Sequence, residues 1–92
     1  MLVTAFEWDE AKRAANLAKH GLDFQIGRRL FDGRKALTRP SPRGDETRHM
    51  TIGEVTGLIL TLIWTERGET VRMISLRRAR DGEKRAYHAH DG

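Results

Sequence analysis

The sequence offers few side chains that could carry chemistry, and most of them are cations. Lys19 and His20 stand near the end of a helical stretch, NLAKHGLDF, which Gly21 stops. Histidine titrates near neutral pH and can move a proton, but in the last turn of a helix it can also simply bind the terminal carbonyl groups. The two residues point about 100° apart on a helix, so we expect only one of them to face a small ligand. The sequence leaves open whether His20 carries a proton or only caps the helix.

Arginine dominates the basic residues, of which it provides thirteen of seventeen. Its planar guanidinium can bind two phosphate oxygens at once, a geometry that the lysine ammonium does not offer. Residues 67–85 hold seven basic and three acidic residues, so their net charge of +4 equals that of the whole chain. This asymmetry predicts an anionic partner for the C-terminal third, with nucleic acid the first candidate and a solvated charged face the alternative.

A strand is expected at residues 70–79, TVRMISLRRA, and its alternation sorts the arginines. In an unbroken strand Arg72 and Arg78 share one face, so they would bracket one groove. Arg77 would lie on the other face, unless a bulge near the end of the strand turns it to the same side.

Two further residues could take part in proton transfer. Glu46, in an otherwise basic loop, could act as a base, although pairing with Arg43 or Arg48 is the favoured interpretation. Tyr87 could stack on a nucleobase or donate a proton, but a lone tyrosine on a terminal helix more often covers the core.

Length and composition limit the classes of protein to which this chain can belong. Ninety-two residues suffice for one compact domain, so we expect a single domain over residues 1–92. The absence of cysteine excludes thiolate nucleophiles, disulfides and cysteine metal sites, and it favours the cytoplasm. His88 and His90 point about 200° apart on a helix and lack a partner, so we expect neither a metal nor a cofactor. The N-terminus predicts neither a signal peptide nor a membrane span.

Two short helices are expected in the first third of the chain. Residues 6–8, FEW, can form a strand, after which Asp9 is a good N-cap for a helix that Gly21 ends. Asp23 caps a second helix, whose apolar repeat continues until Asp32-Gly33 breaks it. The first helix carries a slim apolar stripe that would let it lie close against a neighbour, formed by Ala11, Ala14, Ala15 and Ala18.

The rest of the chain is typical of an antiparallel meander. Asp81 can cap a last short helix after the strands. The sequence therefore predicts an α+β sandwich, in which two N-terminal helices and a short C-terminal helix pack on one face of an antiparallel sheet of three to four strands. The expected strands are a weak one at residues 36–39 and stronger ones at 48–55, 57–64 and 70–79, with a surface loop at 40–46.

Three stretches, in this order, resemble the BrnT toxins of bacterial type II toxin-antitoxin systems. They are FEWDEAKRAANLAKHGLDF, IGEVTGLILTLIWTERGETVRMISLRRA and EKRAY, which together span nearly the whole chain. The resemblance implies a RelE-like fold and a metal-independent ribonuclease that cuts RNA and inhibits translation. It also implies a neutralising ribbon-helix-helix antitoxin, similar to BrnA, with which the toxin binds operator DNA.

Metal-independent RNA cleavage uses the ribose 2′-hydroxyl as nucleophile, so the protein must orient it, move two protons and stabilise negative charge. A non-catalytic nucleic-acid-binding or protein-interaction module with the same basic surface is the alternative. The expected site residues fall into three groups: catalytic His20, Arg72 and Arg78; RNA-binding Lys19, Arg67, Arg77 and Arg80; and, in second rank, Glu46 and Tyr87.

Overall fold

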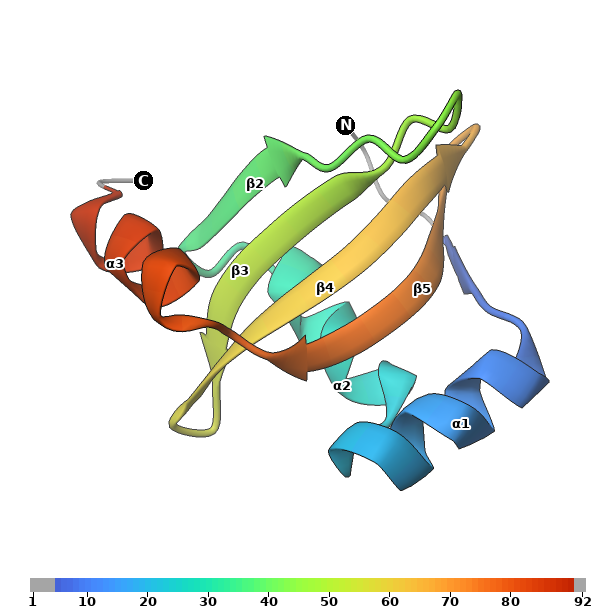
Figure 1. Cartoon of the computed structure of the whole chain (residues 1–92), viewed down its shortest axis with the longest axis horizontal. Coiled ribbons are helices and arrows are strands. Elements are labelled where there is room, and N and C mark those ends of the chain that lie inside the picture. Colours follow the sequence, from blue (N-terminus) through green and yellow to red (C-terminus); the bar gives the residue numbers. More distant parts are fainter. Residues whose placement is uncertain (1–4, 91–92) are drawn as a thin grey trace.

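The computed structural model describes residues 5–90, which form three helices, a 3-10 helix and one five-stranded sheet (Figure 1). The strand order across the sheet is β1-β5-β4-β3-β2. Along the chain the elements are β1 (Ala5–Glu7), α1 (Glu10–His20), α2 (Phe24–Gly27), the 3-10 helix η1 (Arg28–Phe31), β2 (Ala36–Pro40), β3 (His49–Val55), β4 (Leu58–Arg67), β5 (Thr70–Arg78) and α3 (Asp81–Ala89).

The predicted antiparallel meander is confirmed for β2 to β5, which pair in chain order. Thr56 and Gly57 join β3 to β4 with positive φ values of 48° and 82°, as a type I′ hairpin turn requires. The predicted number of strands is too low, because β1 adds a parallel edge strand beside β5. The sequence indicated a strand near residues 6–8 but not the strand with which it pairs. Three residues are too few to show that they pair with a strand more than sixty residues later in the chain.

Helices cover both faces of the sheet, so the predicted arrangement on one face is wrong. Residues of β4 alternate between two apolar clusters, with Leu60 in one and Ile59 in the other. The larger cluster lies beneath α2 and η1, where Phe24 and Leu30 are buried. The smaller cluster lies beneath α3 and includes Tyr87. The chain turns onto this second face directly after β5, so α3 covers one end of it and leaves the rest of the face open (Figure 1).

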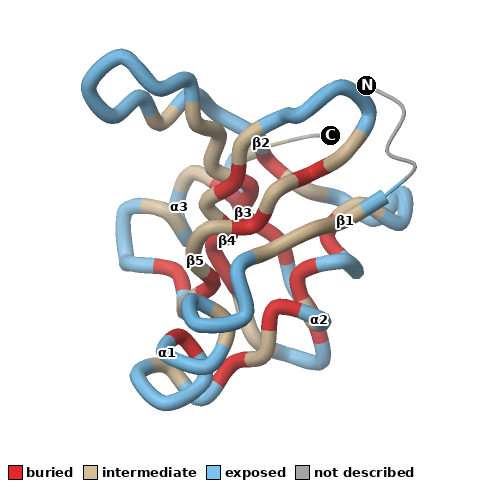
Figure 2. Tube along the Cα trace, turned by 90° about the vertical axis from the view of Figure 1, so that its right-hand side faces the viewer, coloured by how far each residue is buried: buried red, intermediate tan, exposed pale blue. Residues whose placement is uncertain are grey.

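Helix α1 lies along the outer edge of β5 and is mostly exposed (Figure 2). Its one buried residue is Asn16, whose Nδ2 donates to the carbonyl oxygens of Leu22 and Leu76, each at 2.9 Å. Its Oδ1 accepts from the backbone N–H of Leu76 at 3.0 Å, so the amide pairs with β5 as a neighbouring strand would. The predicted alanine stripe is exposed, and it does not form the packing surface. A polar side chain holds this helix in place.

The predicted helix caps are confirmed at three positions. Asp9 accepts from the backbone N–H groups of Ala11 and Lys12, and Asp23 accepts from that of Gln25. Gly21 ends α1 in the left-handed conformation, with φ 69°. None of the helices within residues 5–90 is long and apolar enough to cross a membrane.

Candidate functional site

A bulge in β5 decides which arginines reach the same face of the sheet. The pairing of β4 with β5 slips between Ile63 and Trp64, which leaves Ile74 as an extra residue in β5. Leu76 is therefore buried in the same core as Val71 and Met73, although its spacing from them is odd. By the same alternation Arg77 points to the opposite face, onto which α3 folds. The sequence left open a bulge near the end of this strand; the structure has one, but at Ile74 in the middle of β5, and it leaves Arg77 on the same face as Arg72.

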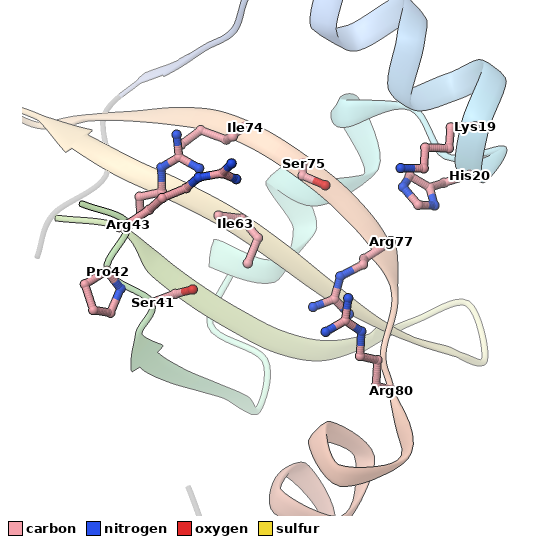
Figure 3. Close-up of a pocket in the computed structure, with 11 residues that line it drawn as sticks. Lys19, His20, Ser41, Pro42, Arg43, Ile63, Ile74, Ser75, Arg77 and Arg80 are labelled. Carbon is pink, nitrogen blue, oxygen red and sulfur yellow. The ribbon is translucent and has the colours of Figure 1, made fainter. Parts of the chain in front are cut away.

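The open part of this second face forms a groove of about 500 Å³ (Figure 3). Its floor is the β4–β5 pair, and its walls are the end of α1, the β2–β3 loop and the start of α3. Six of its lining side chains carry a cation or an imidazole, and the labelled ones approach the floor from different sides in Figure 3. The lining residues are Lys19, His20, Ser41, Pro42, Arg43, Arg48, Ile63, Ile74, Ser75, Arg77 and Arg80.

Lys19 and His20 both line the groove, which corrects the expectation that only one of them would face a ligand. The groove crosses the end of α1, so two neighbouring residues of its last turn can reach it together (Figure 3). Among residues 5–90 the half-buried imidazole of His20 has no hydrogen-bond partner, and the backbone N–H of Gly21 caps α1 instead. Capping by the histidine side chain is therefore not what ends this helix.

Glu83 orients Arg77 at the edge of the groove. The two guanidinium nitrogens donate to the two carboxylate oxygens at 2.7 and 2.9 Å, and Thr61 donates to the same carboxylate at 2.9 Å. The hydrogen bond from Arg77, in a partly buried site, lowers the pKa of Glu83 to about 2. Glu83 also accepts from the backbone N–H of Arg80, which is the N-cap of α3 in place of the predicted Asp81.

The β2–β3 loop forms an ordered basic wall. Backbone hydrogen bonds join Ser41 to Arg48 and, in both directions, Arg43 to Glu46. Arg48 donates to Glu46 at 3.0 Å, which confirms the favoured interpretation of this acid and is the main cause that lowers its pKa. The buried Nε of Arg48 has no hydrogen-bond partner within residues 5–90. Glu46 itself does not line the groove.

Arg72 and Arg78 do not bracket one groove, and that geometric expectation is wrong because of the bulge. Arg72 pairs with Glu7 of β1 at 2.6 Å, and Arg67 lies 4.0 Å from the same carboxylate. Arg78 is exposed and, by the alternation after the bulge, points to the opposite face from Arg72. Their roles in catalysis and RNA binding stay predictions.

Tyr87 lies away from the groove. Its ring is buried in the smaller apolar cluster, with the Lys35 ammonium 4.6 Å from the ring centre. The interpretation of this residue as a core cover therefore fits its position. In the part of the chain that the structure describes, histidine and acidic side chains form no group of three that could hold a metal ion.

Comparison with protein families decides what class of protein carries this groove. The model of a family described as "Ribonuclease toxin, BrnT, of type II toxin-antitoxin system" matches residues 8–83. The chain belongs to the BrnT family. None of the curated proteins matches it. Membership makes it a ribonuclease toxin, which implies an RNA substrate and an antitoxin partner.

The match to BrnT covers all the groove residues from Lys19 to Arg80 and also Glu83, whereas Tyr87 and β1 lie outside it. Sequence reasoning missed the roles of Asn16 and Glu83. Glu83 could have been found as an acid three residues after an N-cap, the spacing of a capping box. Asn16 gives no comparable signal, because one polar residue among small apolar residues on a helix does not indicate a structural role.

Proposed function

We propose that this toxin cleaves RNA in the basic groove without a metal ion, and thereby inhibits translation in the cytoplasm. The observation that carries the proposal is one imidazole, His20, among three cations that form no ion pair within residues 5–90, namely Lys19, Arg43 and Arg80. The groove thus offers a proton carrier and unneutralised positive charge at the same place. Arg48 also lines the groove, although its guanidinium is paired with Glu46.

In the proposed reaction the ribose 2′-oxygen attacks the adjacent phosphorus while the bond from phosphorus to the 5′-oxygen breaks. One proton leaves the 2′-hydroxyl, and one is delivered to the departing 5′-oxygen. His20 provides the imidazole among the groove-lining side chains, and an imidazole can both accept and donate a proton. Arg77 and Arg80 are better placed than Arg72 and Arg78 to stabilise the negative charge on the phosphoryl oxygens, because they line the groove.

We further propose that the antitoxin is a ribbon-helix-helix protein whose acidic residues cover the same groove, and that the complex binds operator DNA. An acidic partner would compete with RNA for the unpaired cations, so its association with the toxin should weaken as salt rises. Amide protection confined to the exposed face of α1 and to α2 would contradict this placement.

Expression in cells without the antitoxin, followed by purification, tests the proposed activity. Growth should stop and cellular RNA should be cut. The purified protein should then cut RNA in the presence of a chelator. RNA that stays intact with correctly folded protein would leave a binding module as the second candidate, since the same cations can hold phosphates without chemistry.

A further inference from the structure

The groove does not end at α1. A second cavity of about 290 Å³ lies between α1 and the edge of β5. It shares four lining residues with the main groove: Lys19, His20, Ile74 and Ser75. The two cavities therefore adjoin at these residues, and we call the pair, which passes over the edge of the sheet, the channel. We call the second cavity the α1 arm, which Lys12, Ala15 and Asn16 complete.

Two lysines of α1 line the α1 arm. Lys12 and Lys19 are seven residues apart, so they lie on the same face of the helix, roughly 10 Å from each other along its axis. Ala15 stands between them, and its small side chain keeps the space between the two ammonium groups open. Asn16 donates both of its amide hydrogens to backbone carbonyl oxygens, so it has no donor left for an anion, and the lysines are the charged groups with which the arm can bind a ligand.

Lys12 also acts on the charge of the basic wall. Its charge contributes to lowering the pKa of Glu46, although the hydrogen bond from Arg48 contributes most. The ammonium group is therefore close enough to the β2–β3 loop for its charge to act on Glu46. Lys12 forms no ion pair among residues 5–90, so its charge is available to a ligand.

We propose that the α1 arm binds the RNA strand that flanks the cleaved bond, with Lys12 holding a backbone phosphate. This inference rests on the proposed function of the main groove. A ligand that fills the main groove and continues past His20 must bend over the edge of β5, which a flexible single strand can do and a stiff duplex cannot. A strand with one negative charge per nucleotide suits two lysines that face the same way. Lys12 is thus a positioning residue, away from the reacting atoms.

Binding of non-cleavable RNA separates this inference from cleavage itself. The probes are single-stranded 2′-O-methyl oligonucleotides of increasing length, which cannot supply the nucleophile. Their affinity is measured by fluorescence anisotropy at several salt concentrations. We expect Lys12→Ala to reduce the salt slope of log Kd by about 0.7 for the long probes, the value for one lost phosphate contact to a single strand. The shortest probes, which fill only the main groove, should bind Lys12→Ala and the wild-type protein equally.

The matched control is Lys84→Ala, which removes one charge from an exposed position on α3 that lines neither cavity. An equal reduction of the salt slope by both substitutions would overturn the proposal, because the effect would then be that of net charge alone. A salt slope for Lys12→Ala equal to that of the wild-type protein would also overturn the proposal. If that variant then bound the purified antitoxin more weakly, the arm would be a protein-docking surface instead. If the Lys12 effect appears but the wild-type protein fails to cut cleavable RNA, the arm stands and the proposed cleavage fails.

Discussion

At the scale of single residues, the site depends on which side chains face the groove and which are already neutralised. His20 faces it without a hydrogen-bond partner among the described residues, and Arg77 faces it in a two-point bond with Glu83. Arg72 is paired with Glu7, and Arg78 points to the opposite face of the sheet. Groups of the same type therefore differ in what they can contribute to RNA cleavage.

We expect His20→Gln to keep the thermal midpoint within a few degrees of the wild-type value and to lower RNA cleavage by about tenfold or more. The imidazole contributes little to the fold, since Gly21 provides the cap of α1. Both quantities are measured on one sample. A large fall in the thermal midpoint with unchanged cleavage would show that His20 has only a structural role.

Arg77→Ala should lower cleavage by about tenfold or more, whereas Arg78→Ala should lower it only slightly, because Arg77 lines the groove and Arg78 does not. Arg77→Ala also leaves the Glu83 carboxylate without its cation, which adds a negative charge to the site. The double variant Arg77→Ala/Glu83→Gln removes that charge and should remain impaired. Equal losses for Arg77→Ala and Arg78→Ala in single-turnover cleavage would argue against the orientation that the bulge imposes.

Glu83 also makes stability depend on pH. Its pKa falls from an ordinary 4.5 to about 2 in the folded protein, so the carboxylate stabilises the fold above pH 4.5. That contribution, on the order of 3 kcal/mol, is lost as pH falls from 4.5 toward 2. Urea unfolding should find Glu83→Gln less stable than wild type at pH 7, with the difference shrinking through this window. A difference that does not change with pH would contradict the role of the ionised carboxylate.

At the scale of elements, the sequence predicted the caps of α1 and α2 and the meander, because those signals are local. It could not predict which helix covers which face. The alanine stripe of α1 looked like a packing surface, yet the structure exposes it and uses Asn16 to attach the helix. A single buried amide that bonds to two carbonyl oxygens and one N–H produces no periodic pattern in the sequence.

Asn16→Ala should therefore reduce the free energy of unfolding by about 3 kcal/mol, because it leaves buried backbone groups of Leu22 and Leu76 without partners. Cleavage should fall with it, since Asn16 fixes the helix end that carries His20. Leu17→Ala is the control, at a position that is 44% exposed, and should change the stability by less than about 0.5 kcal/mol. Chemical denaturation of the two variants would contradict this account if their stabilities were alike.

At the scale of the whole molecule, the sheet edge, the loop and two helix ends converge on one basic channel. The composition located positive charge at residues 67–85, but the channel also draws on Lys12, Lys19, Arg43 and Arg48. These residues come from α1 and from the β2–β3 loop, which only the fold brings beside β5. Charge counting along the chain could therefore predict a basic surface but not its location. That residues 1–92 form a single domain stays a prediction.

Analysis of the ends of the cleaved RNA tests the central claim most directly. If the groove cuts RNA through the 2′-hydroxyl, digestion in the presence of a chelator should yield 2′,3′-cyclic phosphate and 5′-hydroxyl ends. An RNA with a single 2′-deoxy position at the cleavage site should survive at that position. Products with 5′-phosphate and 3′-hydroxyl ends, or cleavage that the chelator abolishes, would contradict the account.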